Sequence, residues 1–239
     1  MSGPLAGRVA LVTGASRGIG AAVAVDLARL GVHCVLVART QGGLEDTDDA
    51  IRAAGGQATL FPFNLARDGE KLDLIGPSIV ERFGRLDILV HAAGALGQLS
   101  PVAHITPKDW TECVAVNLTA SWRLIRSCDP PLRASDAGRA VFVTTGRVIR
   151  PKAYWGAYGA TKAGMEHLVQ SWAQEVATTP LRVNLLDPGI VATAMRAAAM
   201  PGEDPATLPK PADIAPAIAA LCLPAERRHG ETVRLQPSA

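Results

Sequence analysis

Short apolar runs alternate along the chain with longer segments in which apolar residues recur every three or four positions. The short runs are rich in Val, Ile and Leu with little polar alternation, which is typical of strands covered on both faces. We therefore predict seven strands, at residues 8–13, 32–38, 57–62, 86–91, 139–145, 181–186 and 232–235.

The segments between these runs have helical periodicity. Thr106 followed by Pro107 predicts a helix start, because Thr is a good N-cap and Pro suits the first helical position. Gly31 and Pro180 predict helix ends. The helix that ends at Gly31 has an apolar stripe of Ile19, Val23, Leu27 and Leu30. The helix that ends at Pro180 has an apolar stripe of Met165, Leu168, Val169, Trp172 and Val176.

Strands that alternate with helices predict an α/β fold with a parallel sheet. We expect one Rossmann-like, doubly wound domain over residues 1–239, with a seven-stranded parallel sheet and helices on both faces, since no linker divides the chain. Residues 190–211 are irregular and proline-rich, and a loop of that length in a compact domain is usually functional or mobile.

Composition restricts the class of protein. The 239 residues are 48% hydrophobic and 19% charged, which excludes a disordered chain, and a net charge of +2 gives no basis for nucleic-acid binding. The four cysteines form no C-x-x-C pair, and the five histidines do not cluster, so no metal site is expected. Reduced thiols, and the lack of an apolar stretch long enough for a signal or a membrane span, predict a cytoplasmic protein.

A glycine-rich turn follows the first predicted strand. Residues 13–20 read TGASRGIG, with Gly14, Gly18 and Gly20 opening the first helix. Glycines let a pyrophosphate approach the helix N-terminus, where free N–H groups favour an anion. An ordinary tight turn is the alternative, and the strand–turn–helix context favours a dinucleotide.

The end of the second predicted strand indicates which dinucleotide. An NAD site places Asp or Glu there, on the ribose hydroxyl, whereas this chain has Arg39 and no acid before Glu45. Arg39 and Arg17 are suited to the 2′-phosphate of NADP(H), since guanidinium groups hold phosphates in bidentate fashion. The alternative is two solvated arginines paired with Glu45 or Asp46.

Tyr158 and Lys162 stand four residues apart at the start of the long helix before Pro180. This spacing puts both side chains on one face, about 6 Å apart along the axis. Lowering the pKa of a tyrosine from about 10 to neutrality requires roughly 4 kcal/mol, and we expect Lys162 and an oxidised nicotinamide to supply it. Such a pair is often structural on exposed helices, so the interpretation depends on the cofactor turn.

With these motifs in order, the whole chain resembles the short-chain dehydrogenase/reductase family. The resemblance rests on TGASRGIG at 13–20, Asn117 in VNL, the Tyr158–Lys162 pair, and NLLDPGIVAT at 184–193. It implies catalytic roles for Asn117, Thr145, Tyr158 and Lys162. The implied cofactor-binding residues are Gly14, Ser16, Arg17, Gly18, Ile19, Gly20, Arg39, Asn64, Leu65, Ala93, Gly94, Tyr158, Lys162, Pro188, Gly189, Val191 and Thr193.

The resemblance also implies how these residues act. Tyr158 is the general acid in reduction and the base in oxidation, while Lys162 binds the nicotinamide ribose. Asn117 holds a water that relays protons to Lys162. Thr193 and the backbone at residue 190 or 191 hold the carboxamide. Homodimers or homotetramers are implied, paired through the helices that contain Asn117 and Tyr158.

Several positions depart from the family pattern. Thr145 stands where the family has Ser; it keeps the hydroxyl, and its methyl group narrows the site. His91 replaces the first Asn of N-N-A-G, and we interpret it as a packed strand-end residue. Asn64 replaces Asp, with an oxygen that still accepts from adenine. The tail at 233–237 lacks the family's acid and paired glycines, which affects the expected oligomer contact.

Two further groups of side chains can each be interpreted in two ways. Arg147, Arg150 and Lys152 fit either an anionic substrate or, as we favour, a solvated loop. Met195 and Met200 suit either an adaptable lid or ordinary packing.

The sequence therefore predicts an NADP(H)-dependent oxidoreductase that interconverts a small-molecule ketone or aldehyde and its alcohol, with NAD(H) the less favoured cofactor. The first rival is a non-catalytic NADP-binding sensor or regulatory subunit, which Thr145 and His91 favour. The second is a sugar-nucleotide epimerase or dehydratase, which needs further residues after the last strand.

Overall fold

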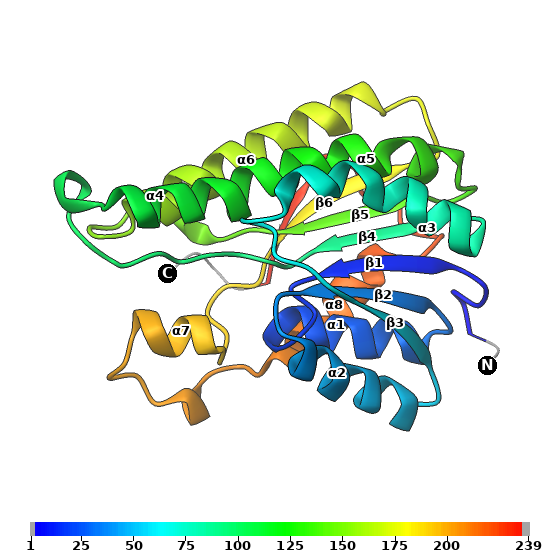
Figure 1. Cartoon of the computed structure of the whole chain (residues 1–239), viewed down its shortest axis with the longest axis horizontal. Helices are drawn as coiled ribbons and strands as arrows, with labels where there is room; N and C mark the ends of the chain where they lie inside the picture. The colour runs from blue at the N-terminus through cyan, green and yellow to red at the C-terminus, as the bar shows by residue number, and fades with distance from the viewer. Residues whose placement is uncertain (1–2, 236–239) are drawn as a thin grey trace.

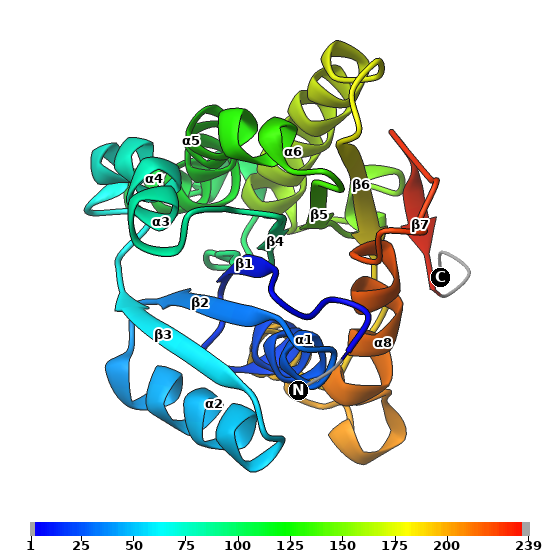
Figure 2. The same cartoon turned by 90° about the vertical axis from the view of Figure 1, so that its right-hand side faces the viewer.

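The computed structural model describes residues 3–235, and all seven predicted strands form one parallel sheet in the order β3-β2-β1-β4-β5-β6-β7 (Figure 2). The prediction of a doubly wound α/β fold is confirmed, with strand ends that differ from the predicted ones by two residues at most. The strands are β1 (Val9–Thr13), β2 (His33–Ala38), β3 (Gln57–Pro62), β4 (Ile88–His91), β5 (Arg139–Val143), β6 (Arg182–Asp187) and β7 (Thr232–Arg234).

Helices cover both faces of the sheet (Figure 1). One layer contains α1 (Gly18–Arg29), α2 (Gln41–Ala53) and α8 (Pro211–Leu221), and the other contains α3 (Ile75–Phe83), α4 (Pro107–Cys113), α5 (Ala120–Ala134) and α6 (Gly156–Glu175).

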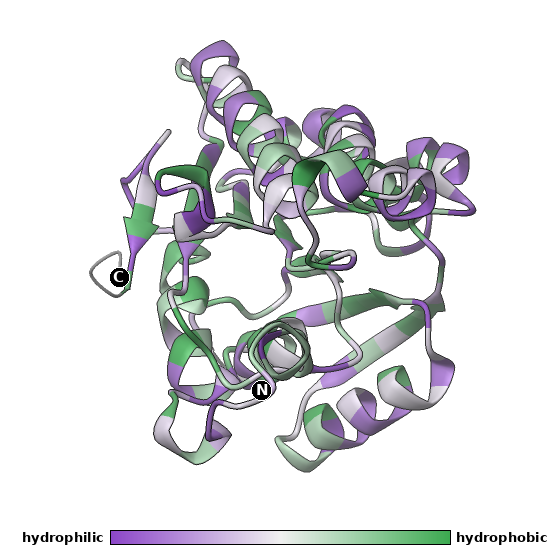
Figure 3. Cartoon of the chain, turned by 90° about the vertical axis from the view of Figure 1, so that its left-hand side faces the viewer, coloured by the Kyte–Doolittle hydropathy of each residue, from purple (hydrophilic) through white to green (hydrophobic). Residues whose placement is uncertain are grey.

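The two layers enclose two apolar cores, one on each face of the sheet. Leu11 belongs to the core under α5 and α6, while its neighbours Ala10 and Val12 belong to the core under α1 and α8. This follows from the alternation of side chains along a strand. Figure 3 shows the resulting colouring, with hydrophobic strands inside and hydrophilic positions on the outer faces of the helices.

The strand order reverses direction between β1 and β4, which creates a switch point at the carboxyl edge of the sheet. Ligands of open α/β sheets bind at such a crevice. Thr13 at the end of β1 pairs with His91 at the end of β4, so the segments that follow these two strands begin side by side.

The expectation of an irregular segment at 190–211 is only partly confirmed. It contains α7 (Ala194–Ala199), which Thr193 caps by accepting a hydrogen bond from the Arg196 N–H at 3.1 Å. Six residues are too few for a periodic signal, and the flanking prolines hid the helix. Of the C-terminal tail at 233–237, residues 236 and 237 lie outside the described residues. Among residues 3–235, no helix is long and apolar enough to cross a membrane.

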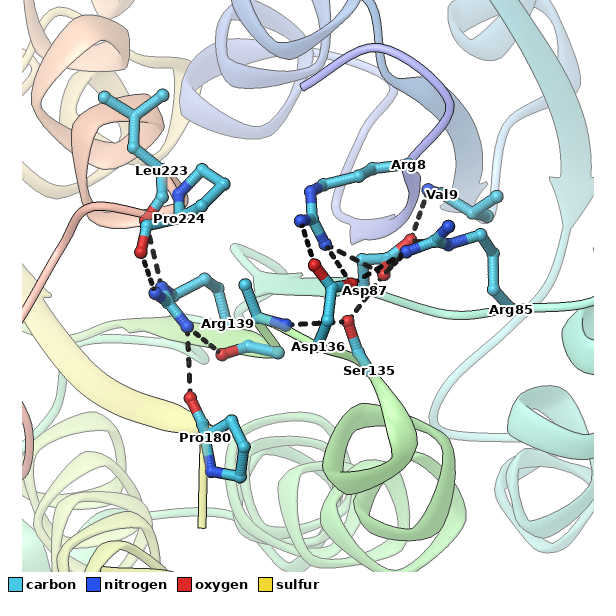
Figure 4. Close-up of polar contacts among 12 residues, drawn as sticks. Arg8, Val9, Arg85, Asp87, Ser135, Asp136, Arg139, Pro180, Leu223 and Pro224 are labelled. Carbon is cyan, nitrogen blue, oxygen red and sulfur yellow. Dashed lines mark hydrogen bonds and ion pairs between the residues drawn. The ribbon is translucent and has the colours of Figure 1, made fainter. Parts of the chain in front are cut away.

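The amino edge of the sheet holds an ion cluster around the buried Asp87 (Figure 4). Asp87 accepts hydrogen bonds from Arg85 at 2.7 Å, from the Ser135 hydroxyl at 2.6 Å, from the Val9 N–H at 3.0 Å and from Arg8 at 3.2 Å. Burial opposes ionisation, but these donors outweigh it and lower the pKa of Asp87. The cluster joins the starts of β1 and β4 to the end of α5.

Arg139 lies beside this cluster at the start of β5 (Figure 4). Its buried guanidinium donates to the carbonyl oxygens of Gly138 and Pro224, both at 2.7 Å, and of Leu223 at 3.0 Å. Burial lowers the pKa of Arg139. The side chain therefore fastens the segment after α8 to the sheet.

Candidate active site

The glycine turn after β1 has a shape that only glycine permits. Gly14 and Gly18 have φ of +68° and +60°, in the left-handed region. A Cβ at Gly14 would lie 2.7 Å from the Ala93 nitrogen, and one at Gly20 would collide with the Gly14 carbonyl. Arg17 precedes α1 in an extended conformation, and no side chain caps the helix. The first N–H groups of α1 are therefore suited to an anion.

Arg39 lies at the end of β2, where the sequence predicted a phosphate-binding cation. Its Nη1 lies 3.4 Å from the Glu112 carboxylate of α4, rather than on Glu45 or Asp46. Both side chains are exposed, so this ion pair is weak. Arg17 is also exposed. The carboxyl edge thus presents two arginines to solvent beside the glycine turn.

A groove lies beside Glu112, the ion-pair partner of Arg39, and extends to the segment after β3. Asn64 forms a turn there, with its Oδ1 accepting from the N–H groups of Ala66 at 3.0 Å and Arg67 at 3.2 Å. The adenine contact assigned to this oxygen stays a prediction, since the turn already uses it. The groove is lined by Ala66, Arg67, Pro107, Lys108, Thr111, Glu112 and Ala115.

Tyr158 lies in the first turn of α6 and is 8% exposed. Burial raises the pKa of Tyr158 to about 12, and a hydrogen bond with the Thr145 hydroxyl opposes that rise. Thr145 precedes η4 (Gly146–Val148) directly after β5. The structure therefore brings Tyr158 and Thr145 together, and their catalytic roles stay predictions.

Lys162 is buried one turn further along α6, and its Nζ donates to the Val143 carbonyl at 2.9 Å. Burial lowers the pKa of Lys162 to about 8. In the chain without a cofactor, Lys162 is not among the groups that lower the pKa of Tyr158. The expected lowering by Lys162 together with an oxidised nicotinamide stays a prediction for the cofactor-bound protein. Both groups are removed from water, burial favours the neutral form of each, and the ammonium is held by a backbone carbonyl instead.

Asn117 lies on the other side of this region, in the π-helical segment η3 (Val114–Thr119). Its side chain exchanges two hydrogen bonds of 2.8 Å with the backbone of Ala95 and donates to Thr161 at 3.0 Å. π-Helical turns occur often at functional sites. The water relay assigned to Asn117 stays a prediction.

Asn117 on one side of the site and Lys162 on the other both lie close to Gly94. A Cβ there would lie 3.6 Å from Asn117 Oδ1 and 3.9 Å from Lys162 Cε. It would also lie 3.6 Å from Met195 Cε of α7, which places one of the two candidate lid methionines at the site. The Tyr158–Lys162 pair therefore lies at the same edge as the glycine turn, because Gly14 contacts Ala93.

The segment after β6 closes this edge. Gly189 has φ of +71°, and its N–H donates to Asp187 at 3.0 Å. Val191 is buried, and the Thr193 methyl lies 3.6 Å from the position of a Cβ at Gly18. Residues 188–193 thus lie opposite the glycine turn. A pocket under α7 is lined by Ala192, Thr193, Ala194, Arg196, Ala197, Met200, Glu203, Pro205 and Leu208.

One site residue was not predicted from the sequence. Glu166 lies four residues after Lys162 on α6 and is 8% exposed, and it accepts a hydrogen bond of 2.6 Å from the Thr144 hydroxyl. Burial raises the pKa of Glu166, and its charge raises that of Lys162. Lys162 and Glu166, on successive turns of α6, thus bind Val143 and Thr144, which directly precede Thr145. The spacing of four residues between Lys162 and Glu166 was the sequence signal that could have identified Glu166.

Other titratable groups near the site are packed residues. His91 is fully buried, its Nδ1 lies 2.7 Å from the Thr13 hydroxyl, and burial lowers its pKa to about 3. This confirms the packing interpretation. The four cysteines are free and buried. Residues 3–235 contain no cluster of metal-ligating side chains.

Comparisons with known proteins agree with this geometry. The sequence pattern described as short chain dehydrogenase matches residues 8–204. The chain is 38% identical to the Uncharacterized oxidoreductase YciK of Escherichia coli K12, over 87% of this chain and 83% of that relative.

Two solved structures have the same fold. A short chain dehydrogenase from Shigella flexneri 2a strain 301, complexed with NADP, has a TM-score of 0.93 at 36% identity and covers 99% of this chain and 100% of its own. A short chain dehydrogenase from E. coli CFT073, complexed with NADPH, has a TM-score of 0.92 at 37% identity, with 98% of both chains covered.

Proposed function

Because this chain belongs to the short chain dehydrogenase family, we propose that it is an NADP(H)-dependent oxidoreductase that interconverts a ketone or aldehyde and its alcohol. The observation that carries the proposal is the meeting of Tyr158, Thr145 and Lys162 with Asn117 and Gly94 at the carboxyl edge, beside the glycine turn. Perturbed pKa values of Tyr158 and Lys162 at such a crevice are typical of catalytic groups.

Tyr158 is the proton donor in the proposed reduction. A phenol whose pKa is raised to about 12 is fully protonated at neutral pH, so it can donate to a carbonyl oxygen that gains negative charge. The Thr145 hydroxyl lies against Tyr158 and orients the same oxygen. Lys162, with a pKa lowered to about 8, stabilises the phenolate left behind. NADP(H) held by the glycine turn and residues 188–193 would supply or accept the hydride.

The residues present fit such a dinucleotide. The α1 N-terminus has no side-chain cap, and the glycine turn leaves room where side chains would otherwise lie. Arg17 and Arg39 supply cations for a 2′-phosphate, with no acid at the end of β2. NADP and NADPH, bound in the two solved relatives, support the same choice here. Residues 188–193 are suited to hold the nicotinamide end, as the sequence predicted.

Turnover of Tyr158→Phe tests the chemistry. We expect NADPH binding to persist while reduction of an accepted substrate from a carbonyl panel falls by about 10³-fold. Tyr154→Phe, which alters the other tyrosine, whose side chain is 59% exposed, is the matched control. Retained turnover in Tyr158→Phe contradicts the assigned proton donor. Tight NADPH binding with no turnover of any panel compound by the wild type favours the sensor instead.

Cofactor titration tests the nucleotide choice. We expect NADPH to bind at least about tenfold more tightly than NADH, and Arg39→Ala to remove most of this difference by weakening NADPH alone. Arg52→Ala removes an exposed arginine from α2 as a control. Equal affinities in the wild type would contradict NADP(H) dependence.

We further propose that residues 1–239 form one domain and that two or four copies assemble through α5 and α6. Two tryptophans on this layer support assembly, because Trp110 and Trp122 are 47% and 43% exposed. Sedimentation velocity distinguishes these forms from a monomer. A cytoplasmic location stays a prediction from the sequence.

A further inference from the structure

Arg147 is the first residue with a side chain after Thr145, because Gly146 lies between them. It lies in η4, where its backbone N–H donates to the Thr145 hydroxyl oxygen at 3.3 Å. Its carbonyl oxygen lies 3.7 Å from the position that a Cβ at Gly159 would take. The turn that carries Arg147 is thus fixed both to Thr145 and to the helix turn that carries Tyr158.

The guanidinium of Arg147 is held by an aromatic contact. Its central carbon lies 5.7 Å from the centre of the Trp155 ring. Trp155 in turn meets Tyr158 edge to face, with ring centres 5.9 Å apart. A backbone bridge between Ser100 and Trp155 fixes the start of this segment from the other side. The positive charge therefore lies two ring contacts from the reacting phenol.

The charge environment of Arg147 is also distinctive. Arg123 and Arg196 are partly buried like Arg147, and each forms an ion pair with a carboxylate. Among the residues that the structure describes, no carboxylate pairs with Arg147, whose side-chain contact is with Trp155. Residues 144–162 contain four Lys and Arg and no Asp or Glu.

We propose that Arg147 binds an anionic group of the substrate, so that the substrates of this site are carbonyl compounds that carry a carboxylate or phosphate group, and the corresponding alcohols. The inference rests on the proposed function and specifies its substrate class. A guanidinium stacked on an indole keeps its N–H edge free, and that edge binds a carboxylate or phosphate in bidentate fashion. Because two rings separate the guanidinium from the phenol, the anionic group lies several bonds from the carbonyl carbon.

Matched substrate pairs test this assignment. Wild-type protein with NADPH is assayed against 2-oxo, 4-oxo and 6-oxo alkanoates, the methyl ester of each, and oxoalkyl phosphates of similar length. We expect kcat/KM for the best carboxylate or phosphate to exceed that of its neutral partner by at least about tenfold, which is 1.4 kcal/mol. The preference should weaken with salt, as expected for a partly exposed cation.

Variants identify the residue. Arg147→Gln should lower the ratio of kcat/KM between carboxylate and ester by about tenfold or more, with the change mainly in KM. Arg147→Lys should restore part of it, since a lysine keeps the charge and loses the bidentate geometry. Lys152→Gln, which removes an exposed cation of the same segment, should leave the ratio unchanged. NADPH titration of each variant verifies that it is folded.

The outcomes separate this inference from the proposed function. A wild type that reduces neutral ketones and shows no preference for the anionic partner overturns the role of Arg147 and keeps the oxidoreductase. An Arg147→Gln variant that keeps the full preference also overturns the role of Arg147 alone. A protein that reduces no carbonyl compound of either kind overturns both.

Discussion

The two edges of the sheet both bury ionisable side chains, but the surroundings of Asp87 at one edge favour its charged form, whereas those of Tyr158 and Lys162 at the other edge favour their neutral forms. At the amino edge, Asp87 is surrounded by donors and cations, and its pKa is lowered. At the carboxyl edge, Tyr158 and Lys162 are buried without a counter-charge in contact, and their pKa values shift toward the neutral forms, to about 12 and about 8.

This difference indicates what each edge does. Charges that are paired and fully hydrogen-bonded contribute to the integrity of the fold and have no capacity left for a ligand. Groups that are buried without a counter-charge can change protonation state when a charged cofactor or substrate arrives. Substitutions at the amino edge should therefore alter stability, and those at the carboxyl edge should alter activity.

Lys162→Met should give the largest effect on activity. We expect kcat/KM to fall on the order of 10³-fold, because the phenolate of Tyr158 loses its stabilising cation. The free energy of unfolding should stay the same or rise at neutral pH, since burying the ammonium has a cost that a methionine lacks. Steady-state kinetics and urea unfolding measure the two quantities, and Lys152→Met is the exposed control. A large loss of stability with unchanged kcat/KM would contradict the comparison.

Asp87→Asn should give the largest effect on stability. We expect the free energy of unfolding at pH 7 to fall by about 3 kcal/mol, because the arginines lose their buried counter-charge. The folded-state pKa of Asp87 lies below its unfolded value, so its stabilisation is complete above about pH 4 and is lost as pH falls through the folded pKa.

Urea unfolding at several pH values measures this contribution. The difference between wild type and Asp87→Asn should shrink in acid, while the activity of folded protein stays near that of the wild type. Asp136→Asn is a milder control, because the Asp136 side chain is 69% exposed. A loss of activity in Asp87→Asn without a loss of stability would contradict the assignment of stability to the amino edge and activity to the carboxyl edge.

Glu166→Gln should have a moderate effect that sharpens the comparison. The charge of Glu166 raises the pKa of Lys162, so its removal should lower that pKa further below 8. We expect the alkaline limb of the kcat/KM profile to move to lower pH, with about a tenfold loss near pH 8.

Stability should move the other way in Glu166→Gln. The folded-state pKa of Glu166 is raised, so its carboxylate destabilises the fold increasingly as pH rises from the unfolded to the folded pKa. Thermal unfolding at neutral pH should thus occur at the same or a higher temperature than in the wild type. Glu175→Gln, on an exposed turn of α6, is the matched control. An unmoved pH profile would remove Glu166 from the site.

Glu112→Gln should give the smallest effect. Glu112 contacts the exposed Arg39 at 3.4 Å, and a 2′-phosphate would compete for the same cation. We expect NADPH to bind about threefold more tightly and NADH to be unaffected, in line with the small free energy of exposed ion pairs. Fluorescence titration at low salt measures this change. Tighter NADH binding in the variant would contradict the competition.

The sequence predicted the sheet and the site unequally well. The five central strands were found because both of their faces are buried, so that hydrophobicity alone marks them, whereas the edge strands β3 and β7 are partly exposed. The helix α7 was missed, because six residues between prolines give no periodic signal. Within the site, Gly14, Gly18 and Gly20 were predicted for backbone reasons that the structure bears out, since each would otherwise meet strain or a collision.

The electrostatics of the site could not be predicted from spacing. An interval of four residues places Tyr158 and Lys162 on one helix face, but it does not reveal that Nζ lies on the Val143 carbonyl. Likewise, the partner of Arg39 is Glu112, which is 73 residues away. A local sequence pattern contains no information on such contacts.

The sequence by itself determined the succession of the seven strands, the glycine turn and the residue types at the candidate catalytic positions. These depend on periodicity and backbone conformation, which are properties of neighbouring residues. Only the tertiary structure decided which groups lose water and which keep a partner, because burial and charge contacts join residues far apart in the chain. That decision separates Asp87, whose charge is paired at the amino edge, from Tyr158 and Arg147, which have no carboxylate partner in the described part of the chain and to which we assign the substrate.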